Sequence, residues 1–250
     1  METGQERAAN PVPPFRKILE AFLMLLFFEG SQGMTLLGLP RHLLGVRRLD
    51  DHPWINVYEG HIWELAFALA FIGISSGPLS QWGLTTRNAR LSLRILWRFC
   101  CVFFLITLAW NVVPVLLSRQ IDLGIFGPPK WIDVAAWLFF EWIFVGIAEE
   151  IMFRGVIQTN LASTWTGVWR VAGVEIPSAG VVTTVLFCLA HINPLHPHVN
   201  WPQQLFALGL GIYYSIVRHR TGSLLNPILA HNAADGMILT AIYLLYFHLH

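Results

Sequence analysis

Charged residues are scarce in this chain, and their scarcity indicates the class of protein. Asp, Glu, Lys and Arg make up 12% of the 250 residues, whereas a soluble domain carries about 25%. Hydrophobic residues make up 55%, and the mean hydropathy is +0.55. This composition excludes an ordinary soluble globular domain and predicts a protein that crosses the lipid bilayer several times.

Cysteine motifs, basic clusters and a standard zinc motif are also missing. Cys100, Cys101 and Cys188 lack CxxC or zinc-ribbon spacing, so we interpret them as buried thiols within apolar segments. The net charge is +1 and no dense basic cluster occurs, which leaves no argument for a nucleic-acid partner. No HExxH pair is present.

The apolar runs predict an all-α fold, a polytopic membrane bundle of about seven to eight transmembrane helices. No small-residue cleavage site follows the first run, so we expect it to be a retained span. Residues 1–14 are expected to be a mobile tail, and residues 15–250 a single transmembrane domain. Spans are expected at 15–28, 62–79, 99–117, 133–161, 179–192, 203–217 and 224–247, with room for an eighth before residue 60.

The basic residues predict an orientation with the N-terminus in the cytoplasm, because short cytoplasmic loops are rich in Lys and Arg. Four basic segments agree with this orientation: 16–17, 87–98, Arg170 and 218–220. The loop that contains Arg41, Arg47 and Arg48 opposes it.

The most informative stretch is Glu149-Glu150-Ile151-Met152-Phe153-Arg154, inside an apolar run. Ionisable groups at membrane depth are costly and persist when they pair, face water or carry out chemistry. Residues four apart share a helix face, so Glu150 and Arg154 are expected to form an ion pair. Glu149 points elsewhere and needs a partner from another segment.

Two further apolar segments carry polar side chains. His191 follows Phe187 by four residues at the end of one span, and His231 precedes Asp235 by four residues on another. Because each would destabilise an isolated span, we expect these groups to meet Glu149 in a shared polar cavity.

Other polar and small residues receive structural interpretations. Asp133 is expected to cap a helix, and Gly209 and Gly211 to permit close helix packing. Asn232 is a reserve hydrogen-bond donor. We interpret the remaining polar side chains as solvated near span starts or in a loop: His61, Glu64, Glu141, His196 and His198.

The ordered patterns Glu149-Glu150-x-x-x-Arg154, Phe187-x-x-x-His191 and His231-x-x-x-Asp235 resemble the motifs of the CPBP intramembrane proteases. That family includes the type II CAAX prenyl endopeptidases and the bacterial Abi proteins. The resemblance covers about Trp137 to Met237 and implies a catalytic core within about 133–247.

The resemblance implies a glutamate-dependent peptidase, and because no HExxH pair is present we favour a mechanism without a metal. Glu149 would be the general base that activates water, and His191 would hold that water or share its proton. His231 and Asp235 would stabilise the oxyanion, with Glu150, Arg154 and Phe187 in support. An ionised Asp235 can only accept hydrogen bonds. It is therefore either protonated or orients His231, and we favour the second interpretation.

The expected partners are the lipid bilayer and a membrane-anchored protein or peptide substrate, and the expected location is the bacterial inner membrane. Three alternatives stay open. One is a zinc-dependent version of the same hydrolysis, with Glu149, His191 and His231 as ligands. The others are a transporter or proton relay and a non-catalytic immunity-type scaffold.

Overall fold

The computed structural model describes residues 13–37, 52, 54–121, 123–126, 130–192 and 199–250. Most of the predicted tail and the loop with Arg41, Arg47 and Arg48 lie outside these residues, as do His196 and His198. The helices are α1 (Pro14–Gly33), α3 (Trp54–Ile74), α4 (Ala89–Thr107), α5 (Val113–Ser118), α6 (Trp131–Phe139), α7 (Val145–Glu150), α8 (Gln158–Leu161), α9 (Ser178–Ala190), α10 (Trp201–Thr221) and α11 (Leu225–Leu249).

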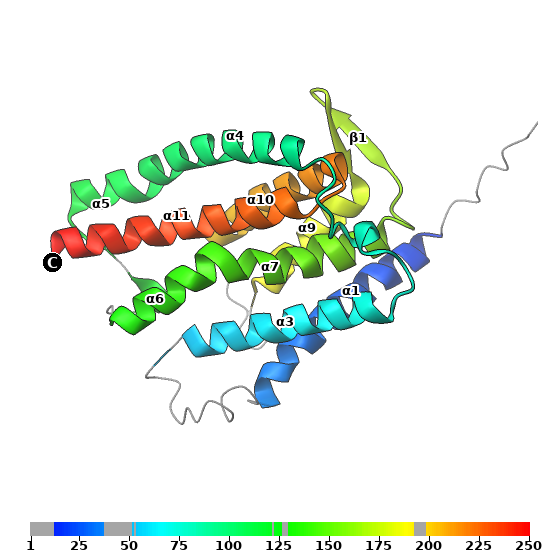
Figure 1. The fold of residues 1–250 in the computed structure, drawn as a ribbon, viewed down its shortest axis with the longest axis horizontal. Coiled ribbons are helices and arrows are strands. Elements are labelled where there is room, and N and C mark those ends of the chain that lie inside the picture. The colour runs from blue at the N-terminus through cyan, green and yellow to red at the C-terminus, as the bar shows by residue number, and fades with distance from the viewer. Residues whose placement is uncertain (1–12, 38–51, 53, 122, 127–129, 193–198) are drawn as a thin grey trace, which may run out of the picture.

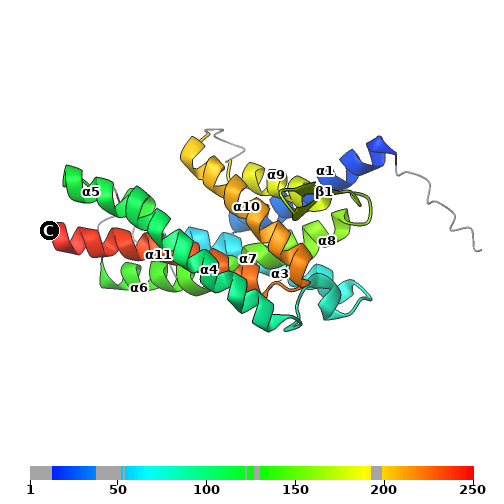
Figure 2. The same ribbon diagram turned by 90° about the horizontal axis from the view of Figure 1, so that it is seen from above.

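The helices run roughly along one axis in two layers. In Figure 1, α4, α11, α7 and α3 lie side by side. Figure 2 shows α9 and α10 against one face of this layer, where α10 packs on both α9 and α11. This stacking surrounds the centre of the helix that runs from residue 131 to residue 161 with other helices.

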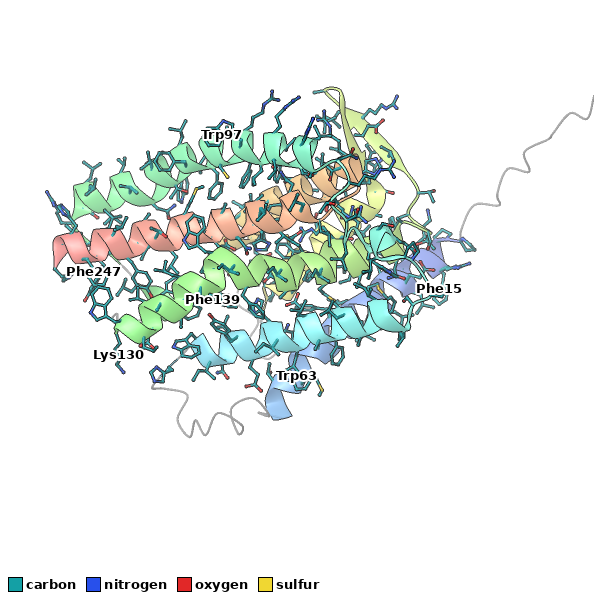
Figure 3. All side chains as sticks on the ribbon, viewed as in Figure 1. Phe15, Trp63, Trp97, Lys130, Phe139 and Phe247 are labelled. Carbon is teal, nitrogen blue, oxygen red and sulfur yellow. The ribbon has the colours of Figure 1, made fainter. Side chains whose placement is uncertain are left out.

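Apolar side chains cover the outside of the bundle as well as its interior. Trp97 is 71% exposed and lies at the outer edge of α4 (Figure 3). Phe139 and Phe247 are also exposed, and so is Cys101, which was expected to be buried. An apolar exterior over hydrogen-bonded helices is what a bilayer requires. The chain is an integral membrane protein with an all-α bundle, as predicted.

The expected number of spans is not supported. Among the described residues, four helices are long and apolar enough to cross a membrane: Trp54–Ile74, Ala89–Ser118, Trp131–Leu161 and Leu225–Leu249. The helix α1 carries Arg16, Lys17, Glu20 and Glu29. The helix α9 has 13 residues and reaches only about 20 Å at 1.5 Å per residue.

The segment between α8 and α9 corrects another expectation. Residues 162–178 lie between two predicted spans and carried no predicted secondary structure, but they contain a hairpin of β1 (Val168–Val171) and β2 (Val174–Pro177). Ala172 and Gly173 have φ angles of 51° and 79°. Two such residues form a tight turn whose twist suits paired strands.

The basic segments gather at one end of the bundle. Arg218 at the end of α10 donates to the Gln81 carbonyl at 3.0 Å, and Asn88 before α4 donates to the Thr221 carbonyl at 3.0 Å. Lys17 lies over the Trp165 ring, beside the hairpin. The described basic segments therefore share a side, as the orientation argument requires.

The helix from residue 131 to residue 161 is irregular around the acidic pair. Wider π-helical turns at Phe140–Phe144 and Ile151–Ile157 flank α7. Such turns leave backbone groups in need of other partners and occur often at functional sites. Asn232 on α11 supplies two partners, accepting from the Gly146 N–H at 2.8 Å and donating to the Ile143 carbonyl at 3.0 Å. Its amide therefore binds backbone and is not a free donor.

Asp133 lies in the first turn of α6, and Lys130 occupies the cap position. The carboxylate instead joins α6 to the start of α3. It accepts hydrogen bonds from the Trp54 indole at 2.8 Å and from His52 Nδ1 at 2.7 Å. The prediction that Asp133 is the N-cap of this helix is therefore wrong, because Asp133 lies three residues after the cap.

Candidate active site

A cavity of about 790 Å³ opens within the bundle, lined by residues of α1, α3, α7 and its flanking π-helical turns, α9, α10 and α11. Its wall is mostly apolar, with several aromatic rings. Ionisable side chains interrupt that wall: Glu29, His61, Glu64, Glu141, Glu149, His191, His231 and Asp235. The structure therefore brings together the residues expected to converge, and adds others from the N-terminal half.

The Glu150–Arg154 pair lies where the i,i+4 spacing predicts it. Arg154 Nη1 donates to Glu150 Oε1 at 2.9 Å, and both side chains are completely buried. Arg154 Nη2 also donates to the Gly211 carbonyl on α10 at 3.2 Å. The guanidinium lies 4.5 Å from the centre of the Phe187 ring. The pair thus joins the acidic helix to α9 and α10.

Phe187 separates the two histidines that motif analysis identified. Its ring centre lies 4.6 Å from that of His191 and 6.1 Å from that of His231. His191 follows the last residue of α9, and its Nδ1 donates to the Phe187 carbonyl at 2.8 Å. With the proton on Nδ1, the Nε2 atom of a neutral His191 is a hydrogen-bond acceptor.

His231 is held on both ring nitrogens. Its Nδ1 donates to Glu150 Oε1 at 2.8 Å, and Tyr214 stacks on its ring at 5.2 Å. Its Nε2 lies 3.1 Å from Asp235 Oδ2 and 3.5 Å from Glu149 Oε2. Glu150 therefore binds Nδ1, and a carboxylate on one ring nitrogen fixes the orientation of the imidazole and the position of its proton. Asp235 contacts the other nitrogen, Nε2, which also faces Glu149, and its role in orienting His231 stays a prediction.

Glu149 finds its partner on α3. His61 Nε2 lies 3.0 Å from Glu149 Oε1, and His61 Nδ1 donates to the Val57 carbonyl at 2.7 Å. Glu149 Oε2 has no hydrogen-bond partner among the described residues. The carboxylate is therefore held through Oε1, whereas Oε2 is buried 3.5 Å from His231 Nε2 without a hydrogen bond among the described residues.

The interpretation of His61, Glu64 and Glu141 as solvated residues was wrong. The helix α3 starts at Trp54 rather than near residue 62, which places His61 and Glu64 inside the span. Glu64 is 1% exposed, and all three residues line the cavity. The spacing of His61 and Glu64 was the available signal, because residues three apart share a helix face.

One group of side chains has the composition and spacing of a metal site. Ligand atoms of His61, Glu64 and Glu149 lie within 4.8 Å of one another. Imidazole and carboxylate ligands suit Zn²⁺. The hydrogen bond from His61 Nδ1 to a backbone carbonyl is also common for a metal-bound His. Only Glu149 is shared with the ligand set predicted from the sequence.

The fold and the cavity define an integral membrane protein with carboxylate and imidazole groups inside its bundle. Residues 131–237 match the family model described as type II CAAX prenyl endopeptidase Rce1-like. This match confirms the resemblance of the segment to the CPBP/CAAX proteases, and it supports a CAAX-type intramembrane protease. No curated protein and no solved structure matches the chain.

Proposed function

We propose that the protein is an endopeptidase of the bacterial inner membrane that hydrolyses a peptide bond in a membrane-tethered protein or peptide. Glu149 is the general base, and no metal is required. The observation that carries this proposal is the position of Glu149. Its carboxylate faces a cavity inside a membrane bundle, with one oxygen bound by His61 and the other directed towards His231.

The first chemical step needs a base and a held water. Glu149 Oε2 has no hydrogen-bond partner among the described side chains, so it can accept a proton from a water in the cavity. His191 lines the same cavity, and its Nε2 can accept the second hydrogen of that water. As the water oxygen bonds to the peptide carbon, its proton passes to Glu149. General-base assistance of this kind contributes about 10²- to 10⁴-fold.

The second requirement is a donor for the oxyanion. His231 Nδ1 is bound to Glu150, so Nε2 is the nitrogen that can donate to the developing charge. Asp235 lies at this same nitrogen. An ionised Asp235 would repel the oxyanion, whereas a protonated Asp235 would be a second donor. The proton on Glu149 then passes to the leaving nitrogen as the C–N bond breaks.

The substrate class follows from the position of the site. A cavity reached through a membrane bundle favours a substrate that is itself in or on the bilayer. The family description names prenyl endopeptidases, which agrees with a membrane-tethered substrate. The wall is apolar enough for a hydrophobic segment or a lipid group next to the cleaved bond.

A comparison of membrane proteomes tests this proposal. Cells carrying Glu149→Gln should accumulate uncleaved precursors and lose the matching new termini found with the wild type. Glu175→Gln is the control, because Glu175 pairs with Arg170 on the exposed hairpin. If the wild type and Glu149→Gln give the same termini, the protein is not a Glu149-dependent protease.

A further inference from the structure

His61 lies outside the segment that matches the protease family, yet it makes a direct contact with the proposed base. It comes from α3, and the matched segment begins at residue 131. Its Nε2 lies 3.0 Å from Glu149 Oε1. The site therefore takes one member from the N-terminal half of the chain.

The hydrogen-bond pattern fixes the protons of this contact. A backbone carbonyl can only accept, so His61 Nδ1 carries a proton that it donates to Val57 at 2.7 Å. The contact between Nε2 and Glu149 Oε1 then needs one further proton, which is shared between the two atoms. Only an ionised Glu149 can be the base, so this proton belongs on His61 Nε2, which donates to Oε1 and leaves Oε2 for a water.

Two neighbours keep the imidazole in place. The Phe140 ring meets the His61 ring edge-on, with centres 4.9 Å apart. The Glu64 carboxylate, 1% exposed, lies within 4.8 Å of the ligand atoms of both His61 and Glu149. Glu64 Oε1 has no hydrogen-bond partner among the described residues. A carboxylate so placed stabilises positive charge on the neighbouring ring.

We propose that His61 is the positioning residue for Glu149, an inference that rests on the proposed function. By holding Oε1, it turns Oε2 towards His231 and the cavity, where the substrate water is deprotonated. The proton taken from water resides on Oε2 until the C–N bond breaks, when it passes to the leaving nitrogen. The proton between His61 and Oε1 stays in place throughout.

The variants His61→Ala and His61→Gln separate positioning from a structural role. The amide of Gln can donate a hydrogen bond to Glu149 Oε1, whereas Ala cannot. His61→Ala should lower kcat by about 10- to 100-fold, the effect of one hydrogen bond to a charged group, and leave KM unchanged. His61→Gln should recover much of the lost kcat.

His52→Ala is the matched control. His52 makes a similar contact of 2.7 Å with the Asp133 carboxylate but does not line the cavity, and Trp54 still donates to Asp133 when His52 is removed. The His52→Ala variant should therefore keep the wild-type kcat. The substrate is a precursor that accumulates in Glu149→Gln membranes, and thermal unfolding of each variant is measured in the same detergent.

The outcomes distinguish the two proposals. If Glu149→Gln retains activity, the proposed function fails. If Glu149→Gln is inactive but His61→Ala keeps the wild-type kcat, only the positioning role fails. The positioning role is also overturned if His61→Gln is as slow as His61→Ala, or if kcat falls only in step with thermal stability. Loss of bound zinc and zinc-dependent activity in His61→Ala would make His61 a metal ligand and overturn positioning.

Discussion

Replacing Arg154 by Met should destabilise the protein more than any exposed charge change. Arg154 is completely buried and binds Glu150 at 2.9 Å and the Gly211 carbonyl at 3.2 Å. Met fills part of the space but leaves the buried Glu150 carboxylate without its cation. Removing one partner of a buried ion pair costs about 3–5 kcal/mol.

The second partner of Glu150, His231, should keep the cost of Arg154→Met near the lower end of the range of about 3–5 kcal/mol. His231 Nδ1 still donates to Glu150 Oε1 at 2.8 Å, so the carboxylate is not wholly unpaired after the change. We therefore expect the loss to lie near 3 kcal/mol. The double variant Glu150→Gln with Arg154→Met should be more stable than the sum of the single effects predicts, by about 1 kcal/mol or more.

The assay is equilibrium unfolding in mixed micelles, for the two single variants and the double variant. Arg170→Met is the control, because Arg170 pairs with Glu175 at 2.7 Å on the exposed hairpin. The Arg170 guanidinium holds the pKa of Glu175 below its ordinary value, but solvent screens this pair and its loss should leave stability unchanged. If Arg154→Met is as stable as Arg170→Met, or if the double variant is simply additive, the buried pair does not join the helices as described.

Three further predictions concern the cavity and its packing. Asp235→Asn should keep or raise kcat because an amide can donate to the oxyanion, whereas Asp235→Ala should lower kcat. Equal losses of kcat for the two variants in cleavage assays would contradict a role of residue 235 as an oxyanion donor. Gly211→Ala should destabilise the protein by about 1–3 kcal/mol, because an added Cβ would lie 2.7 Å from Thr184 Cγ2 and 3.1 Å from Arg154 Nη2. Gly209→Ala is its control, with nothing within 4 Å of the added carbon, and equal unfolding midpoints for the two variants would refute the packing argument. Cleavage should continue in the presence of a strong chelator, and loss of activity that zinc restores would favour the zinc-dependent alternative.

Sequence periodicity was sufficient where both partners lie on one helix. The spacing of Glu150 and Arg154 predicted their ion pair, and it also implied that Glu149 needs a partner from another segment. The partner itself could not be identified from the sequence. The start of α3 was placed about eight residues late, because Trp54 to His61 mixes polar and apolar residues. That error moved His61 from the interior of the span to its solvated end.

Packing between helices determines two features that the local sequence pattern could not predict: which glycine of α10 lies at a helix contact, and which nitrogen of His231 contacts Asp235. Gly209 and Gly211 are equivalent in sequence, but only Gly211 faces Thr184 and Arg154. The choice depends on how α10 rotates against α9, which no local pattern specifies. Asp235 shares a face with His231, as predicted. Which ring nitrogen it contacts was decided by Glu150, a residue of another helix.

The most direct test of the central claim is cleavage of an accumulated precursor by the purified full-length protein in liposomes. With wild-type protein and Glu175→Gln, we expect cleavage at the terminus found in cells, with one ¹⁸O atom from labelled water in the new carboxyl group. With Glu149→Gln, the rate should fall by at least about 10²-fold. Cleavage by Glu149→Gln at the wild-type rate would contradict the account.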